Sequence, residues 1–384
     1  MFQRCYFGED NASIIRRESY MKEILIVANL ASSFGGNWLQ SMKALEKNKD
    51  IHVRYLLPEA AAKQYWIKEI NHSYFTDWSL GSLKKIWQKI NSDQPVDIVH
   101  FHYVGGKNGL LCRIAFTGSC RFLWHVHNHD ISKGRLAPVK DILKKWMYRD
   151  SFKIGVSDSV SDSVRKISSK NVQTVYNAMD FKRMDVTGEE SCISKEPGVI
   201  RCMIMGNHFE RKGVDMAAKA VQMLTMGGVK AELYIVADSY FNPQIESFLN
   251  QRVGQSWRSF AKIIPTRNDI ATYYKKMDFF LSPSREEGWT WAIEEAAYCG
   301  CQVIASSIPG QDENKVPGFY WVGNPNHKDI STEIVDVIKK AYKLSEKNKE
   351  EMMKKSITYM KKQFSMDKWV ENVVRIYDEV MREK

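Results

Sequence analysis

The chain has 384 residues, of which 44% are hydrophobic and 26% are charged, a balance that excludes a wholly disordered or fibrous protein. At roughly 150 residues per domain, this length predicts two domains. Lys and Arg outnumber Asp and Glu by 56 to 45, a formal net charge of +11, which indicates an anionic partner: nucleic acid, a membrane surface or a phosphorylated substrate. No apolar run reaches the ~18 residues of a membrane-spanning helix.

The chain begins with a segment that differs from the rest. Residues 1–20 mix Arg, Glu and Asp without a continuous apolar stretch, so they do not resemble a secretory signal. Met21 opens a short apolar run at 21–27 that is typical of the first strand of an α/β domain. We therefore expect Met21 to be the natural start and residues 1–20 to be an upstream extension or a loose arm.

Strand-like and helix-like stretches alternate from residue 21 onward. In the first half, short apolar runs at 24–28, 53–57, 98–102, 122–127, 154–157 and 172–176 predict strands, and 38–45 predicts a helix. A polar stretch at 187–198 interrupts the pattern and is expected to be a linker. Runs at 200–205, 231–237, 261–264, 279–282 and 303–305, with a helix near 214–226, then repeat it. This predicts an α/β fold of two doubly wound, Rossmann-like domains, residues 21–186 and 199–364, with ligands in a cleft beyond the strands' carboxyl ends.

The most informative segment runs from Ser282 to Gly310. A strand ends at Ser282, a tight loop passes through Gly288, and a helix is expected from about residue 290 to 299. The free amides at its start form a site for an anion. Glu295, about one turn inside the helix, offers two acceptor oxygens that suit a ribose cis-diol, and Glu287 on the loop can reach groups beyond the phosphates. The alternative is a surface helix whose acidic residues suit its dipole.

This segment resembles the retaining glycosyltransferases of family 4, which have the GT-B fold. That family carries an E-x7-E signature in the setting P-S-x-x-E-G-F-G-x-x-x-x-E-A-x-x-x-G. The matching residues in this chain are Pro283, Ser284, Glu287, Gly288, Glu295, Ala296 and Gly300, and Thr290 replaces the second loop glycine. The resemblance implies that Glu287 is catalytic and that Gly288, Trp289, Thr290 and Glu295 bind the donor.

A second landmark is Arg211-Lys212-Gly213, which matches the family's K-G motif at the first helix of the second domain. The resemblance implies that Lys212 neutralises the donor diphosphate, with Arg211 as a second cation, because charge-assisted contacts suit phosphate. Many members place an Arg directly after the preceding strand's glycine, where this chain has Asn207. Arg211 and Lys212 would then carry more of the neutralisation. A solvated helix start is the alternative interpretation.

The first half carries a glycine pair and two histidine-rich strands. Gly35-Gly36 matches the family's glycine loop, which implies donor binding at Gly36 by close backbone approach, although any tight turn suits such a pair. The histidines at 97–102 and 124–130 resemble two family strands, and His127 is our active-site histidine, a hydrogen-bond partner for a donor-sugar hydroxyl. His125 is the alternative. These histidines also suit a metal cluster, but GT-B enzymes work without a metal and no D-x-D motif is present, so we expect no metal and no cofactor.

The resemblance covers about residues 21–384 and implies a function. A retaining, metal-independent enzyme would move a hexose-type sugar from a nucleoside-diphosphate sugar to a glycan or lipid-linked acceptor, in cell-surface polysaccharide synthesis. In this fold the last helix, expected within 365–384, crosses back onto the first domain. One alternative is a GT-B relative with another role, either a sugar-nucleotide epimerase or an inactive partner subunit. A nucleic-acid-binding protein is less favoured, since the sequence has no recognised module for it.

Basic residues gather around tryptophans in two stretches of the first domain. One contains Lys140, Lys144, Lys145, Trp146, Arg149 and Lys153, and the other contains Lys84, Lys85, Trp87 and Lys89. A basic helix with aromatic residues suits an anionic lipid surface, and a solvated helix face is the alternative. The seven scattered cysteines do not indicate a disulfide framework. We therefore expect a cytoplasmic protein with peripheral contact to the inner face of the membrane.

Overall fold

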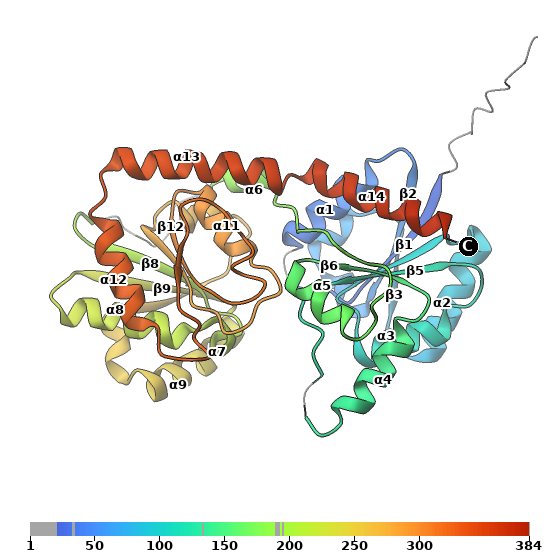
Figure 1. Ribbon diagram of the computed structural model, residues 1–384, viewed down its shortest axis with the longest axis horizontal. Coiled ribbons are helices and arrows are strands. Elements are labelled where there is room, and N and C mark those ends of the chain that lie inside the picture. The colour runs from blue at the N-terminus through green and yellow to red at the C-terminus, as the bar shows by residue number, and fades with distance from the viewer. Residues whose placement is uncertain (1–20, 33–34, 133, 189–192, 194–195, 384) are drawn as a thin grey trace, which may run out of the picture.

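The computed structural model describes residues 21–32, 35–132, 134–188, 193 and 196–383. They form two α/β domains that lie beside each other (Figure 1). The expected extension at 1–20 and half of the expected linker at 187–198 lie outside the described residues.

The first domain is built on a parallel sheet with the strand order β3-β2-β1-β4-β5-β6-β7 in its described part. The strands are β1 (Lys22–Ala28), β2 (Ile51–Pro58), β3 (Ser73–Thr76), β4 (Ile98–His102), β5 (Arg121–Val126), β6 (Phe152–Gly155) and β7 (Val172–Thr174). The order reverses between β1 and β4, and ligands of doubly wound sheets bind beside such a switch point. Residues 24–28 of β1 are fully buried, because helices cover both faces of the sheet.

Helices connect these strands. They are α1 (Gly36–Glu46), α2 (Leu80–Asp93), α3 (Gly106–Ala115), α4 (Ala137–Met147), α5 (Asp158–Arg165) and α6 (Phe181–Asp185), with short 3-10 turns at Glu59–Lys63 and Tyr65–Glu69. Serine starts two of them: the Ser79 hydroxyl accepts a hydrogen bond from the Ser82 amide in α2, and Ser157 accepts one from the Val160 amide in α5. These caps satisfy amides that have no partner inside the helix.

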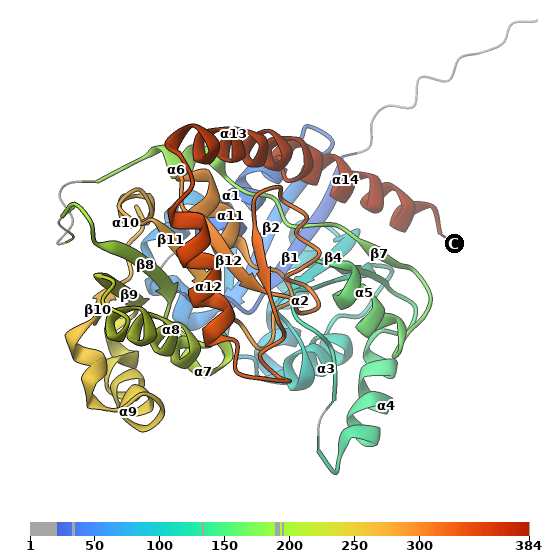
Figure 2. The ribbon, with the colours of Figure 1, turned by 60° about the vertical axis from the view of Figure 1, so that its left-hand side comes forward.

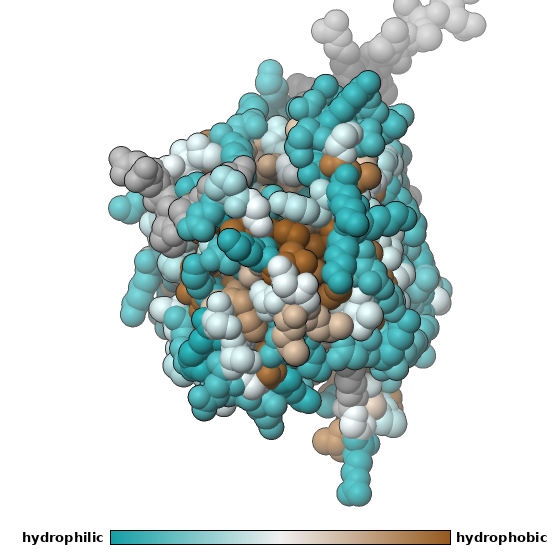
Figure 3. Space-filling model, turned by 90° about the vertical axis from the view of Figure 1, so that its left-hand side faces the viewer, coloured by the Kyte–Doolittle hydropathy of each residue, from teal (hydrophilic) through white to brown (hydrophobic). Residues whose placement is uncertain are grey.

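The second domain repeats the design with the order β10-β9-β8-β11-β12-β13 in its described part. Its strands are β8 (Ile200–Met205), β9 (Ala231–Ala237), β10 (Ala261–Pro265), β11 (Phe279–Ser282), β12 (Gln302–Ser306) and β13 (Tyr320–Val322). Its helices are α7 (Phe209–Lys212), α8 (Val214–Met226), α9 (Asn242–Arg252), α10 (Ala271–Tyr274), α11 (Trp291–Tyr298), α12 (Ser331–Tyr342) and α13 (Glu346–Gln363), with 3-10 turns at Ser239–Phe241 and Gln255–Ser259. Hydrophilic residues surround an apolar centre on the face shown in Figure 3.

The chain returns to the first domain at its end. Helix α13 lies over the second domain, and α14 (Met366–Arg382) continues from it across the first (Figures 1 and 2). Trp369, Val373 and Tyr377 of α14 are buried in one apolar cluster with residues of β1, β2 and α1. Their spacing places them on one face of the helix, so burial of that face joins the chain end to the first domain.

Most of the predicted architecture is confirmed, and some details are wrong. The two doubly wound domains are present, but the short strands β3 and β13 were not predicted. Lys153 is not on a basic helix: it lies in β6, 2% exposed, and its ammonium donates to the Ser151 carbonyl oxygen at 2.8 Å. Burial lowers the pKa of Lys153 to about 8. Trp87 packs into the core of the first domain, so α2 presents lysines outward without its tryptophan.

Candidate active site

The loop between β11 and α11 lies against the junction of α7 and α8. At that junction Gly213 has a φ of +73°, and a Cβ there would lie 2.1 Å from the Pro283 carbonyl oxygen. Only glycine permits both this backbone conformation and this approach. The K-G pair therefore has a structural cause: Gly213 lets the chain pass close to the loop, and Lys212 then lies beside it.

Glu287 is the centre of a charged cluster on this loop. It is buried, and its two carboxylate oxygens meet Lys212 Nζ at 2.6 Å and Arg211 Nη1 at 2.9 Å. Burial by itself raises the pKa of Glu287, but the charges of Lys212 and Arg211 and the hydrogen bond from Lys212 outweigh it and lower the pKa below its ordinary value. Two cations around one carboxylate leave a net positive charge on the cluster. The structure thus brings together three of the predicted site residues.

Gly288 brings the same loop into contact with the first domain. A Cβ at Gly288 would lie 2.1 Å from the carbonyl oxygen of His127, which follows β5. A Cβ at Gly310, which has a φ of +84°, would lie 2.2 Å from the Glu287 carbonyl oxygen. These two approaches fix the loop between the end of β5 and the segment after β12. A side chain at Gly288 would therefore push the domains apart, and one at Gly310 would displace the loop within the second domain.

His127 is the histidine nearest to this contact. As a residue it is partly exposed, its ring stacks on Tyr103 with centroids 3.9 Å apart, and its Nε2 lies 3.1 Å from His102 Nδ1. His125, by contrast, is 3% exposed. Burial lowers the pKa of both imidazoles, that of His125 to about 3, so both are neutral near pH 7. The partial exposure of His127 favours it over His125 as a group that reaches a ligand.

Behind His127, buried histidines pack against each other. Among the described residues, ligand nitrogens of His100, His102 and His125 lie within 4.8 Å of one another. Neutral imidazoles of this kind suit a transition metal. His100 Nδ1, however, lies 2.8 Å from the hydroxyl of Tyr377, which comes from α14. That contact gives the histidines a packing role at the docking site of α14, and the absence of a metal stays a prediction.

Glu295 lies where the two domains meet. Its Oε1 accepts a hydrogen bond from Asn37 Nδ2 at 2.9 Å and forms an ion pair with Arg183. The Asn37 side chain also accepts a hydrogen bond from the Asp180 amide at 3.0 Å. Asn37 is next to Gly36, which has a φ of +54° and no described atom within 4 Å of its Cβ position. The predicted glycine loop and the second signature glutamate are therefore neighbours across the cleft.

Two predicted donor-binding residues direct their side chains inward. The Trp289 ring stacks on Tyr176 at 5.1 Å and meets Phe364 edge-on at 5.3 Å. The Thr290 hydroxyl donates to Gln311 Oε1 at 3.2 Å, and within the described residues it does not cap α11. Both residues hold the loop in place. Their side chains point away from the first turn of α11, whereas their backbone continues into it.

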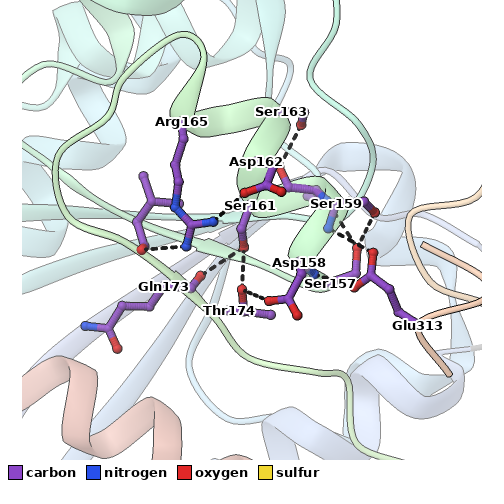
Figure 4. Close-up of polar contacts among 12 residues, drawn as sticks. Ser157, Asp158, Ser159, Ser161, Asp162, Ser163, Arg165, Gln173, Thr174 and Glu313 are labelled. Carbon is purple, nitrogen blue, oxygen red and sulfur yellow. Dashed lines mark hydrogen bonds and ion pairs between the residues drawn. The ribbon is translucent and has the colours of Figure 1, made fainter. Parts of the chain in front are cut away.

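A further polar contact joins the domains at α5 (Figure 4). Glu313, from the segment after β12, accepts hydrogen bonds from the Asp158 amide at 2.5 Å and the Ser159 amide at 2.8 Å. A carboxylate at a helix N-terminus is stabilised by both the free amides and the dipole. Glu313 thus acts as a cap that one domain supplies to the other. Glu313, Asn37 and Arg183 belong to no recognised sequence motif. The sequence therefore did not identify them as site residues, and the one available indication was that Asn37 is next to Gly36.

A cleft of about 560 Å³ lies next to these contacts. The first domain lines it with His129, Ser159 and Lys166, among others, and the second with Arg285, Ile308 and Asn326. Arg285 is held by a two-point ion pair with Asp215, at 3.0 and 2.8 Å. Because Glu286 also lines the cleft, its wall continues directly into Glu287 of the charged cluster.

Comparison with known proteins agrees with this geometry. Residues 200–340 match the family model of glycosyl transferases group 1. An O-antigen biosynthesis glycosyltransferase of Escherichia coli is 22% identical over 71% of this chain and 76% of its own length. The N,N'-diacetylbacillosaminyl-diphospho-undecaprenol α-1,3-N-acetylgalactosaminyltransferase of Campylobacter jejuni is 27% identical over 47% of this chain and 44% of its own.

A solved structure extends the likeness to nearly the whole chain. An Anabaena protein, HepE, in complex with UDP and glucose superposes with a TM-score of 0.74, at 15% identity, over 93% of this chain and 100% of that one. The predicted GT-B fold is confirmed by this match. Together, the family model and the relatives support a glycosyltransferase.

Proposed function

We propose that this protein is a retaining glycosyltransferase of family 4. It moves a hexose-type sugar from a nucleoside-diphosphate sugar to a glycan or lipid-linked acceptor. The observation that supports this most is the cluster of Lys212, Arg211 and Glu287 directly ahead of α11. Its net positive charge and the first amides of that helix suit a diphosphate leaving group.

The remaining donor groups follow from their positions. Glu295 accepts the ribose hydroxyls mainly through Oε2, since a carboxylate accepts several hydrogen bonds. Asn37 and Arg183 share Oε1, and Oε2 accepts one long hydrogen bond, from the Tyr274 hydroxyl at 3.4 Å. Gly36 lets the donor approach the backbone of α1. His127, neutral because burial lowers its pKa, forms a hydrogen bond with a hydroxyl of the donor sugar.

Retention of configuration is the finer part of the proposal. The bond between the sugar's anomeric carbon and the phosphate oxygen breaks, and the acceptor oxygen forms its bond on the same face. The acceptor's proton passes to the departing diphosphate, as the resemblance to family 4 implies. Glu287 already binds two cations, so it stabilises this arrangement and does not act as the nucleophile.

The acceptor side is supported by the cleft and by the relatives. A volume of about 560 Å³ between the domains lies within the range of small-ligand sites, about 300–1,000 Å³. The names of the Escherichia coli and Campylobacter jejuni relatives refer to O-antigen biosynthesis and to a diphospho-undecaprenol acceptor. We therefore propose a role in cell-surface polysaccharide synthesis in the cytoplasm, without a metal. None of the helices in the described residues is long and apolar enough to span a bilayer.

The test is release of nucleoside diphosphate from a panel of nucleotide sugars, with and without lipid-linked glycans as acceptors. Glu287→Gln and Lys212→Ala should each lose most of the transfer activity while remaining folded. Lys219→Ala is the matched control, because Lys219 pairs with Asp329 in an exposed contact of the same domain. Full activity in either site variant would refute the site. Conversion of the nucleotide sugar without transfer would favour an epimerase.

A further inference from the structure

Helix α4 carries an apolar surface that the domain does not cover. Six large apolar side chains on this helix and the loop before it are between 38% and 68% exposed: Ile131, Leu136, Val139, Ile142, Leu143 and Trp146. Figure 1 shows that α4 extends away from the body of the first domain. We call these six residues the α4 patch. Large apolar side chains exposed together on one element indicate an interaction site.

The residues of the α4 patch that belong to the helix lie on one of its faces. Residues 139, 142, 143 and 146 repeat at the three- and four-residue spacing that places side chains on one side of a helix. All residues of α4 are described, and Met147 is the one that is buried. The helix therefore does not use its apolar stripe to pack on its own domain, as α2 does with Trp87.

Cations surround the α4 patch. Arg135, Lys140 and Lys145 are exposed, Lys144 pairs with Asp130, and the exposed Arg149 pairs with Asp150. Asp141 is the acidic residue within the helix. An apolar stripe bordered by lysines, with a tryptophan near its end, suits an anionic bilayer, because the apolar side chains enter the headgroup boundary while the cations meet lipid phosphates.

We propose that the α4 patch docks this protein on a bilayer of anionic lipid, with the helix lying in the interface plane. Ile131 belongs both to the patch and to the lining of the cleft between the domains. Docking therefore sets the cleft beside the lipid headgroups, where a lipid-linked acceptor presents its phosphate. This last step rests on the proposed function, whereas docking itself does not.

The test uses the full chain and vesicles of phosphatidylglycerol and phosphatidylethanolamine, without donor or acceptor. Co-sedimentation should be strong, should fall as salt is raised and should be weak on phosphatidylcholine vesicles. Ile142→Glu/Leu143→Glu should lower the partition coefficient at least tenfold, since these side chains are 68% and 44% exposed and the fold does not need them. Lys140→Gln/Lys145→Gln should weaken binding and flatten its salt dependence. Met223→Glu/Met226→Glu on α8, 39% and 82% exposed, is the matched control and should bind as the wild type does.

Three results would overturn the proposal: no binding to the anionic vesicles, equal loss in the α8 control, or unchanged binding in the α4 variant. Sedimentation velocity without lipid provides a fourth, because a dimer that Ile142→Glu/Leu143→Glu dissociates would mean that a second copy covers the patch. Since no sugar is transferred in these experiments, their failure leaves the glycosyltransferase assignment intact. A wild-type protein that binds the vesicles but transfers no sugar, even to a water-soluble acceptor, would count against that assignment instead.

Discussion

The cluster around Glu287 makes a prediction that depends on charge as well as on contact. Lys212→Met removes one of its two cations and keeps an apolar stem of similar length. Lys212 and Arg211 together leave the cluster with a charge of +1, so this variant brings it to zero. Glu287→Gln raises it to +2, and the double variant returns it to +1. If the cluster binds a diphosphate through its charge, affinity should follow this order.

The size of the effect follows from the geometry. Lys212 Nζ lies 2.6 Å from Glu287 and its side chain is only 17% exposed, so solvent screens it little. A charge-assisted hydrogen bond contributes about 1.5–3 kcal/mol. At about 1.4 kcal/mol per factor of ten, Lys212→Met should weaken nucleoside diphosphate binding about 10- to 100-fold. Arg211 remains at 2.9 Å from the carboxylate, so some affinity is retained.

Two assays separate binding from chemistry. Titration calorimetry with UDP, GDP and ADP identifies the base and then gives affinities for the four proteins. Rates of diphosphate release from the matching nucleotide sugar report transfer. Binding should be weakest for Lys212→Met, recover in the double variant and be at least as tight as wild type for Glu287→Gln. Transfer should fall in all three, because Glu287 also positions the cations.

Equal loss of diphosphate affinity in Glu287→Gln and Lys212→Met, with no recovery in the double variant, would refute this reasoning. That pattern would mean that the pair matters only for the shape of the loop. Thermal unfolding of each variant provides the control for folding.

Three further predictions concern the rest of the site. Glu313→Gln should raise the KM for the donor several-fold, because it weakens a carboxylate–helix contact worth about 0.3–2 kcal/mol and so favours separated domains. An unchanged KM and an unchanged radius of gyration would show that the Asp158 and Ser159 amides do not need the negative charge. The free energy of unfolding should fall as the pH drops from about 6.5 toward 3, because burial lowers the pKa of His125 to about 3 while the unfolded chain takes up the proton near 6.5. Each such histidine adds a slope of about 1.4 kcal/mol per pH unit, and urea titrations that show no slope between pH 7 and 5.5 would contradict it. Transfer should survive dialysis against EDTA; a loss that zinc restores would mean that His100, His102 and His125 hold a required metal.

The sequence predicted the elements whose stability is local or whose burial is complete. The apolar runs of β1 and β8 are nearly unambiguous because central strands of a parallel sheet are buried on both faces. The short strands β3 and β13 lie at sheet edges, where a few half-buried residues leave no clear pattern. Lys153 was wrongly predicted for a different reason. It stands in a basic stretch of the sequence, which predicts an exposed side chain, but β6 places it in the interior.

The contacts of the site also fall into those that the sequence predicted and those that it did not. Lys212 and Gly213 lie on a motif whose spacing has a steric cause, so their meeting with Glu287 was predictable. The contacts of Glu295 were not, since Asn37 is 258 positions away in the chain and Arg183 is 112. Trp289 stands at a motif position, but Tyr176 and Phe364 draw its ring into the core. Such contacts arise only when the two domains and the end of α13 come together.

The central claim is that a nucleoside-diphosphate sugar reacts at the loop ahead of α11, between Lys212 and His127. It is tested most directly by incubating the wild type and Lys212→Met with a panel of nucleotide sugars and a lipid-linked acceptor, and measuring the glycosylated product and the released diphosphate. The account predicts equal amounts of both from the wild type, with an α-donor giving an α-linkage, and at least a tenfold slower reaction in the variant. Product formation at the same rate in both proteins, or an inverted linkage, would contradict it.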